Sequence, residues 1–377
     1  MSPVNVEEQL GVLREQALAR ELPPSEGWPR LQRRLRREPW RRAALVTGLA
    51  LAVLVAGVAP GLLARRTQQP AVPTVDMPVV PGRPVVAARI RLERPFTDVD
   101  VGFGATWVAS QGALLRIDLR INRVVATIPT PLTGENASIA FGEGAVWVTS
   151  GQANGLVYRV DPAANRVTAA IGVPGGAFGI VVAVGTVWVT QFLPEPDPGI
   201  VARIDARTNQ LLSPVEVPNM PGAIRYGQDA IWVTSRFTVS RIDPRSGAVS
   251  QPLRRVGDVR AVGAGSLWGA YANSAEDAGV QRIDPVTGQV VATIRIPNGV
   301  LIAFGLGTLW VAQDASSIPS GGTELGKLYR IDPTSNRVLG RPVRLPGIAP
   351  TGLAVGEGTV WVGEQDRTTL TRFNLAP

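Results

Sequence analysis

The side chains best suited to chemistry in this sequence are carboxylates in four segments rich in small and polar residues. They are Glu195 and Asp197 in QFLPEPDPG, Glu276 and Asp277 in AYANSAEDAG, Asp314 in AQDASSIPSGGTELG, and Glu364 and Asp366 in EQDRTT. Two of these segments also carry an aromatic residue, Phe192 and Tyr271. Functional side chains concentrate in loops that a rigid scaffold positions. These residues therefore predict a pocket for a cation or a basic ligand.

Cysteine and histidine are both absent from the 377 residues. Their absence excludes disulfides, thiolate nucleophiles, zinc sites built on Cys or His, and histidine general bases. Catalysis would have to use carboxylates, hydroxyls, arginine, tyrosine or the single lysine, Lys327. None of the four segments has the ligand spacing of an EF-hand loop. We assign no catalytic residue, no cofactor and no metal, and the alternative that these carboxylates are simply solvated stays open.

The elements that must position these segments are seven copies of one unit. Each copy contains one tryptophan: Trp107, Trp147, Trp188, Trp232, Trp268, Trp310 and Trp361, at spacings of 40, 41, 44, 36, 42 and 51 residues. Glycines recur three and five residues before the tryptophan, as in FGEGAVWVTS, and we expect them to supply the positive backbone angles of a tight hairpin. The exceptions at these positions are Ala183 and Asp229.

A second hairpin follows each of the first six tryptophans, as in VQRIDPVTGQVVATI. Its aspartate opens the turn by accepting from nearby amides, and an Asn or Gly four residues later is able to adopt the left-handed conformation. The aspartates are Asp118, Asp161, Asp205, Asp243, Asp284 and Asp332. Because the arginine and aspartate of this RID motif recur in nearly every unit, we interpret them as repeat structure and not as a site.

Each unit of about 40 residues therefore holds four strands, which is the length of a propeller blade. The last unit stops at TLTRFNLAP without an outer strand, whereas VVAARIRL from Val85 to Leu92 resembles an outer strand without a unit of its own. We expect this segment to pair with Thr369 to Asn374 and to close the ring, which removes an exposed sheet edge. The sequence predicts an all-β, seven-bladed β-propeller over residues 85–377.

A membrane anchor precedes this domain. The 22 residues from Ala43 to Ala64 carry no charge, and a helix of about 20 such residues spans a bilayer. Nine arginines precede this segment and only Arg65 and Arg66 follow it closely, so the positive-inside rule places residues 1–42 in the cytoplasm. A proline-rich linker, 65–84, leads to the extracytoplasmic propeller. Much of the +8 net charge is explained by this anchor, and we expect no nucleic-acid partner.

The cytoplasmic tail contains two short amphipathic patterns. Its arginines are suited to anionic lipid headgroups, and the alternative is a docking site for a cytosolic protein. The acidic helix pattern, PPSEGW, the arginine-rich run and the apolar span resemble membrane-anchored proteins of actinobacteria, including some anti-sigma factors. That resemblance implies a transmembrane regulator with a cytoplasmic partner.

The G-x-G-x-x-W-V and RIDPxTGxV motifs of residues 85–377 resemble the YVTN-type and streptogramin (virginiamycin B) lyase-like propellers. This resemblance implies the propeller fold. Lyases of that family use histidines, acidic residues and magnesium, and the chain has no histidine to carry that role. We therefore expect a non-enzymatic binding, sensing or interaction module. The alternatives are a carboxylate- or metal-dependent lyase or hydrolase, and an anti-sigma-like regulator.

Overall fold

The computed structural model describes residues 79–376 except 133–135, 152–154, 192–197, 219, 236–237, 255, 275–276, 298, 315–324 and 348. The predicted tail, the predicted membrane segment and residues 65–78 of the linker lie outside the described residues. Within the described part, the regular elements are β-strands, and no helix there is long and apolar enough to cross a bilayer.

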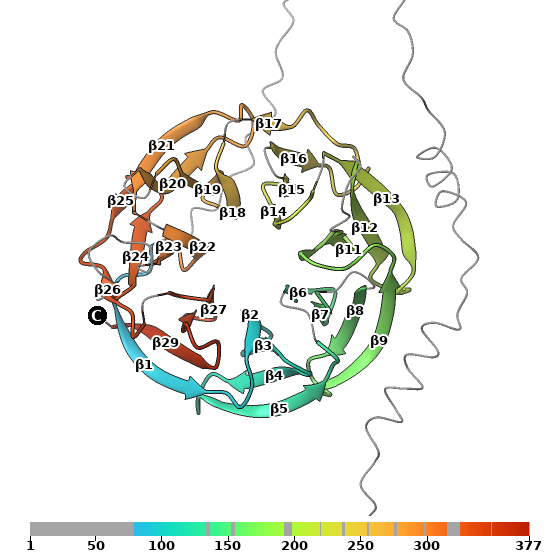
Figure 1. Ribbon diagram of the computed structural model, residues 1–377, viewed down its shortest axis with the longest axis horizontal. Helices are drawn as coiled ribbons and strands as arrows, with labels where there is room; N and C mark the ends of the chain where they lie inside the picture. Colours follow the sequence, from blue (N-terminus) through green and yellow to red (C-terminus); the bar gives the residue numbers. More distant parts are fainter. Residues whose placement is uncertain are drawn as a thin grey trace, which may run out of the picture. The chain divides into compact units, whose positions relative to one another are not determined.

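The described residues form seven antiparallel sheets arranged in a ring (Figure 1), so the predicted fold and the number of blades are confirmed. Blade 1 contains β2 (Phe96–Gly102), β3 (Ala105–Ser110), β4 (Ala113–Asp118) and β5 (Arg123–Pro129). Blade 2 contains β6 (Ile139–Gly142), β7 (Ala145–Thr149), β8 (Gly155–Asp161) and β9 (Arg166–Val173). Blade 3 contains β10 (Ile180–Ala183), β11 (Thr186–Thr190), β12 (Gly199–Asp205) and β13 (Leu211–Val217).

The remaining blades follow the same order. Blade 4 contains β14 (Ile224–Gly227), β15 (Ala230–Ser235), β16 (Thr238–Ile242) and β17 (Leu253–Arg254). Blade 5 contains β18 (Asp258–Gly263), β19 (Ser266–Ala272), β20 (Ala278–Ile283) and β21 (Val290–Arg295). Blade 6 contains β22 (Gly299–Gly305), β23 (Thr308–Gln313), β24 (Lys327–Asp332), β25 (Arg337–Val338) and β26 (Val343–Arg344). Blade 7 contains β27 (Gly352–Gly356), β28 (Thr359–Gly363), β29 (Thr369–Ala376) and β1 (Arg83–Arg91).

Two outer strands are short for a visible reason. In blade 4 the outer segment pairs with β16 through the two residues of β17 and has an isolated bridge between Val249 and Ile242, and Pro252 lies between the two pairings. In blade 6 the outer edge is divided into β25 and β26, which both pair with β24, and Gly340 and Pro342 separate them. Proline has no amide hydrogen to donate to a ladder, so these strands are interrupted where it occurs.

The second strand of each blade forms the core between neighbouring sheets. All residues of β3, β7, β11, β23 and β28 are buried, including their threonines, and this agrees with sequences that alternate little between polar and apolar residues. Each of the seven repeated tryptophans is at most 1% exposed. In most blades the indole donates to the carbonyl of the residue five positions earlier, for example Trp107 Nε1 to Gly102 O at 3.0 Å. This bond satisfies the one polar atom of a buried tryptophan.

The two repeated glycines of the first hairpin have different roles, which corrects the expectation that both supply positive angles. In blade 1, Gly104 has a φ of 68°, and the positive angle beside it belongs to Phe103 at 52°. The earlier glycine leaves room for the next blade. A Cβ on Gly263, for instance, would lie 2.1 Å from Cδ1 of Phe304. Asp229 has a φ of 52°, as predicted, whereas Ala183 is not among the residues with positive φ.

The RID turns join adjacent blades at the periphery, which confirms their interpretation as repeat structure. Arg116 lies over Trp107 with its Cζ 5.6 Å from the ring centroid, and it donates to Asn165 Oδ1 of the next blade at 3.0 Å. Asn165 has a φ of 51°. Asp118 Oδ1 accepts from the amide of Arg120 at 2.7 Å, and this bond and others hold the pKa of Asp118 below its usual range. Five other blades repeat the arginine–tryptophan contact.

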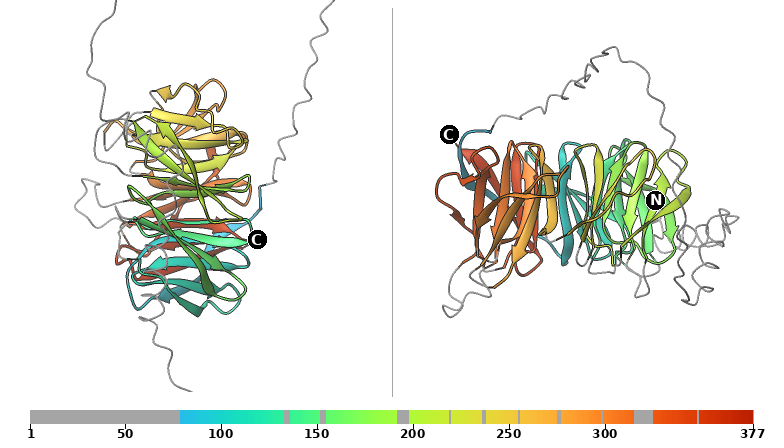
Figure 2. Two further views of the ribbon diagram at one scale, coloured as in Figure 1. Left: turned by 90° about the vertical axis from the view of Figure 1, so that its right-hand side faces the viewer. Right: turned by 90° about the horizontal axis from the view of Figure 1, so that it is seen from above.

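The ring closes as the sequence predicted. Strand β1 pairs antiparallel with β29, with Val85 opposite Asn374 and Arg91 opposite Thr369. Blade 7 has no outer hairpin of its own, so it offers no RID turn to the arginine of blade 6. The N-terminal segment accepts from that arginine instead. Arg330 donates to the carbonyls of Val80 and Gly82. The closed ring has two faces, which are seen edge-on in Figure 2. From the antiparallel strand order, one face, the turn face, carries the tight turns between first and second strands and between third and fourth strands, and the other, the loop face, carries the other connections.

Candidate functional site

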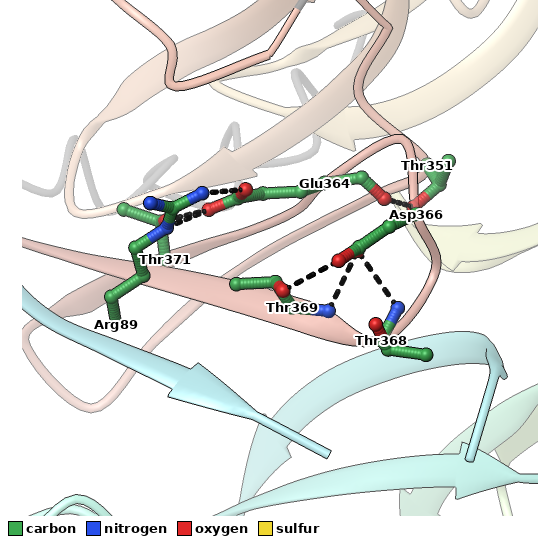
Figure 3. A network of polar contacts seen from close by, with 7 residues as sticks. All are labelled: Arg89, Thr351, Glu364, Asp366, Thr368, Thr369 and Thr371. Carbon is green, nitrogen blue, oxygen red and sulfur yellow. Dashed lines mark hydrogen bonds and ion pairs between the residues drawn. The ribbon is translucent and has the colours of Figure 1, made fainter. Parts of the chain in front are cut away.

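Two of the predicted carboxylates, Glu364 and Asp366, lie together on the loop face of blade 7. They line a pocket of about 370 Å³ with Gly347 and Gln365. Figure 3 shows that the Glu364 carboxylate points away from Asp366 and toward β1 and β29. Its Oε1 accepts from Arg89 Nε at 2.6 Å and from the Thr371 hydroxyl at 2.7 Å, and its Oε2 pairs with the Arg89 guanidinium. Glu364 therefore joins the closing strand to the last blade.

Asp366 is also occupied by its own loop. Its Oδ1 accepts from the amides of Thr368 and Thr369, each at 2.9 Å, and its Oδ2 accepts from the Thr369 hydroxyl at 2.7 Å (Figure 3). Partial burial alone would raise the pKa of Asp366, but these hydrogen bonds stabilise the carboxylate and lower it to about 2. This carboxylate is anionic at any physiological pH and organises the turn between β28 and β29.

Tyr271 and Asp277 meet in blade 5. The Tyr271 hydroxyl lies 3.4 Å from Asp277 Oδ1, and the amide nitrogen of the Asn273 side chain donates to Asp277 Oδ2 at 3.0 Å. Arg295 faces the same carboxylate at 3.7 Å. Burial, followed by the charge of Asp277, raises the pKa of Tyr271. The arrangement stabilises the connection between β19 and β20.

The other predicted site residues divide into two groups. Asp314 follows β23 in blade 6, and Glu195, Asp197 and Glu276 lie outside the described residues. The described members thus occupy blades 5, 6 and 7, and the structure brings them together only in the pairs Glu364 with Asp366 and Tyr271 with Asp277. No group of three or more acidic side chains able to hold a metal occurs among the described residues. That these residues bind a ligand stays a prediction.

The first strands of the blades lie innermost in the ring (Figure 1), and in three blades, on β2, β14 and β18, they carry a different set of charged residues. The first-strand position opposite the tryptophan is occupied by Ala or Val in five blades. These are Ala140, Val181, Ala261, Ala303 and Ala354. In the other two blades the position holds Asp100 and Arg225. We call Asp98, Asp100, Arg225, Asp258 and Arg260 the axial cluster.

The acidic side of the axial cluster comes from blade 1. Asp98 Oδ2 accepts from the amide of Ile139 in blade 2 at 2.8 Å, and Asp98 Oδ1 accepts from Val99 at 2.9 Å. Asp100 Oδ1 accepts from the amide of Val101 at 2.8 Å. On the same strand Val99 is 3% exposed and packs against blade 7, so the two aspartates alternate with it and face the other way.

The basic side comes from blades 4 and 5. The Arg225 guanidinium donates from Nε to the carbonyl of Arg260 at 2.6 Å and from Nη1 to the carbonyl of Ile224 at 2.7 Å. Arg260 forms an ion pair with Asp258, and their side chains are 42% and 36% exposed. In this described part of the ring, the Asp258 Oδ1 and Arg260 Nε atoms are themselves buried and lack a hydrogen-bond partner. The cluster therefore combines access to water with unused hydrogen-bonding atoms.

The axial carboxylates are strongly perturbed. Burial raises the pKa of Asp98 to about 6. Burial and the neighbouring charge of Asp98 raise the pKa of Asp100 to about 7. The positive charge of Arg225 acts in the opposite direction on both groups and offsets only part of this effect. Both carboxyl groups thus titrate closer to neutral pH than ordinary aspartates do, which suits either a charged ligand or proton transfer.

Sequence reasoning missed the axial cluster because it searched the long loops and treated the first strands as identical. The signal was available in the repeat itself. Aligning the seven units on their tryptophans places TDVDVG and AIRYG beside SIAFG and GLAVG, and the charged residues appear as departures from an apolar column. A repeat can form without these charges, so their presence in only some blades is informative.

Comparison with known proteins supports the fold. No family model and no curated protein matches the sequence. Among solved structures, virginiamycin B lyase from Staphylococcus aureus matches with a TM-score of 0.58 at 19% identity, over 77% of this chain and 99% of that chain. Kuenenia stuttgartiensis hydrazine synthase matches with a TM-score of 0.59 at 12% identity, over 78% and 99%. The Neurospora crassa Pan2 WD40 domain matches with a TM-score of 0.61 at 10% identity, over 79% and 98%.

These likenesses cover the propeller and show its fold alone, because propellers support many unrelated activities. The expected resemblance to streptogramin lyases is confirmed at that level, and the chain is equally similar in fold to WD40 domains.

Proposed function

We propose that the chain is a membrane-anchored binding protein whose propeller, outside the cytoplasm, takes a small charged ligand at the axial cluster. The observation that carries this proposal is the replacement of a small apolar residue by Asp100 in blade 1 and by Arg225 in blade 4. The other blades have only Ala or Val at this position, and Ala140, Ala261 and Ala354 belong there to the buried apolar clusters. Places where a sequence departs from the requirements of its own fold tend to be functional.

The energetics agree with a binding role. Burial of a carboxylate costs free energy unless it is well compensated, and burial is the main cause of the raised pKa values of Asp98 and Asp100. A ligand that brings a positive group to these aspartates would offset the free-energy cost of their burial. Arg225 and Arg260 offer donors to a negative group on the opposite side. The matching ligand is a small molecule with charges of both signs, such as an amino acid or a betaine.

A thermal-shift experiment tests this proposal. The full chain in detergent is titrated with panels of zwitterionic, cationic and anionic small molecules, and Asp100→Asn and Arg225→Gln are the matched variants. We expect zwitterionic compounds to raise the Tm of the native chain and to lose that effect in both variants. A compound that stabilises the native chain and both variants equally would place binding elsewhere and contradict the axial site.

The anchor is tested independently. Residues 43–64 are expected to keep the chain in the membrane fraction at alkaline pH, and protease added outside intact cells should reach the propeller but not residues 1–42. The described residues contribute no spanning helix of their own. Release of the chain at alkaline pH would refute the anchor, and protection of the propeller would refute the orientation.

A second candidate function is acid–base catalysis at the axial cluster. Asp98 and Asp100 have pKa values of about 6 and 7, the range in which a carboxyl group is an efficient proton donor and acceptor. Virginiamycin B is the probe suggested by the structural neighbour. Incubation of the chain with virginiamycin B and Mg²⁺, followed by mass spectrometry, should show no conversion if the protein only binds. Conversion that Asp100→Asn abolishes would favour the enzyme.

We further propose that residues 1–42 contact a cytoplasmic protein. Support comes from the arginine-rich tail and its resemblance to the tails of membrane-anchored regulators. A pull-down with full-length protein, compared with a chain lacking residues 1–25, tests it. Recovery of the same cytosolic proteins by both chains would contradict a specific partner for the deleted segment.

A further inference from the structure

The membrane tether enters the propeller on the turn face. Strand β1 runs antiparallel to β29, so Arg83 lies beside Ala376 at the end of the blade that faces away from the Glu364 loop. Just before β1, the amide of Val80 donates to the carbonyl of Leu306, which lies in the turn between β22 and β23. The carbonyl of Val80 also accepts from Arg330, next to the RID turn of blade 6. These contacts fix the start of the ring to the turn face.

Apolar side chains are exposed at the turn tips of this same face. Val286 is 89% exposed, Ile121 57%, Val184 43%, and Phe103 and Tyr226 each 41%. They come from blades 1, 3, 4 and 5, and they lie in or beside the turns between strands. Exposed apolar residues that occur singly need no explanation. Several at the tips of one face, next to the attachment of a membrane tether, call for a common partner.

Arginines alternate with these tips. Exposed arginines follow the aspartate of the RID turns in several blades: Arg120, Arg123, Arg166, Arg207, Arg245 and Arg337. The aspartates of these turns accept from amides of their own turns, as Asp205 Oδ1 does from Arg207 and Thr208 at 2.9 and 2.8 Å, and they stay negatively charged beside the arginines. Glu143 and Glu357 accept from the amides of neighbouring turns. Asp229 is exposed and carries the opposite sign.

The tether is short enough to keep this face near the bilayer. Fourteen residues, 65–78, separate the predicted membrane segment from the first described residue. A proline-rich chain of that length in the polyproline II conformation spans about 43 Å at about 3.1 Å per residue. Apolar tips among arginines match an interface of acyl chains and anionic headgroups. We infer that the turn face docks on the anionic lipid surface of the membrane that anchors the chain, which leaves the loop face open to solvent.

This inference rests on the proposed anchor, and the absence of native cysteine makes it directly testable. Val286→Cys on the turn face and Gln111→Cys on the loop face are each labelled with an environment-sensitive fluorophore in the full chain. Both positions are exposed, so neither substitution disturbs the core. The proteins are reconstituted in nanodiscs of phosphatidylcholine alone or with phosphatidylglycerol. We expect a blue shift and quenching by lipid-attached quenchers at position 286 in anionic nanodiscs, and neither effect at 111.

Charge reversal provides the matched control. Arg120→Glu, Arg207→Glu and Arg245→Glu together should abolish the signal at position 286, at about a fivefold loss of the docking equilibrium per arginine removed. Arg94→Glu, Arg254→Glu and Arg344→Glu make the same change in net charge at exposed positions toward the loop face and should leave the signal intact.

Each other outcome is decisive. The docking would be overturned by any of three results: no spectral change of the label at position 286, an equal response in both lipids, or an equal loss of signal with both triple variants. Protein crosslinks from position 286 in cells, without a lipid response, would assign the face to a protein partner. Alkaline extraction of the same samples separates the two proposals, because a chain that resists extraction but shows no signal refutes only the docking.

Discussion

The periphery and the centre of this propeller follow opposite rules. At the periphery, one arrangement of arginine, tryptophan and turn aspartate recurs around the ring, and in four blades its arginine donates to the turn asparagine of the next blade. At the centre, the first strands share an apolar pattern that only three blades break. The peripheral pattern is what a closed ring needs from every unit. The central departures are not needed by the ring, so they point to function.

The largest effect is expected from the repeated core. Trp147→Ala removes a side chain that is 0% exposed and lies under the guanidinium of Arg159. The cavity and the lost contacts should cost about 3–5 kcal/mol of the free energy of unfolding. Chemical denaturation measures it, with Tyr226→Ala, an aromatic residue that is 41% exposed, as the control. Equal losses in both variants would contradict a core built on the tryptophans.

The next effect concerns the contact between first strands of adjacent blades. Gly263→Ala would place a Cβ 2.1 Å from Cδ1 of Phe304, so the blades must separate or Phe304 must move. Overpacking of this kind costs about 1–3 kcal/mol. Gly172→Ala is the control, since no heavy atom lies within 4 Å of its added Cβ. Comparable melting temperatures for the two variants would show that the glycine is not required for space.

Ring closure should show a smaller effect. Glu364→Ala removes the acceptor of Arg89 and Thr371 between β1 and the last blade, at a cost of about 1–2 kcal/mol. Glu364→Gln keeps an acceptor for Thr371 and should lose less. Glu93→Ala, which removes an exposed carboxylate in the connection after β1, serves as the reference. If Glu364→Ala were no less stable than that reference, the contacts of Glu364 with Arg89 and Thr371 would not contribute to the stability of the ring.

The smallest effect is the pH dependence of the centre. The folded pKa values of Asp98 and Asp100, about 6 and 7, lie above the ordinary 3.8. The folded state therefore binds protons that the unfolded chain releases, and this stabilisation is complete below about pH 4 and is lost as pH rises to about 7. After allowance for solvent access we expect roughly 1 kcal/mol less stability at pH 8 than at pH 5.

Asp98→Asn with Asp100→Asn should remove this component of the pH dependence. Urea denaturation of the native chain and the double variant at both pH values measures the difference. An identical pH dependence in both proteins would mean that the two aspartates titrate normally in the folded state.

Much of the fold was predictable because it is encoded locally and repeatedly. The tryptophan spacing indicated seven blades, and the similarity of Val85–Leu92 to an outer strand predicted its pairing with Thr369–Asn374, which the register confirms. The left-handed Asn and Gly residues of the RID turns also agree, as Asn122 at 55° and Gly247 at 75° show. Local turn chemistry and repetition are readable without a structure.

The candidate site was less predictable because its contacts are not local. Glu364 pairs with Arg89, 275 residues earlier in the chain, so its role in closure cannot be read from EQDRTT. The axial cluster likewise takes its residues from blade 1 and from blades 4 and 5, which are far apart in the sequence. The role of Gly263 was missed for a related reason, since only the packed ring shows that Phe304 needs its space.

The central claim is that the axial charges serve function and not the fold, and the double variant Asp100→Ala with Arg225→Ala tests it most directly. It gives both positions the alanine that four other blades carry and leaves the net charge unchanged. Urea denaturation at pH 8 should show the variant to be at least as stable as the native chain. A loss of more than about 2 kcal/mol would mean that the charges hold the ring together, and it would contradict the functional assignment.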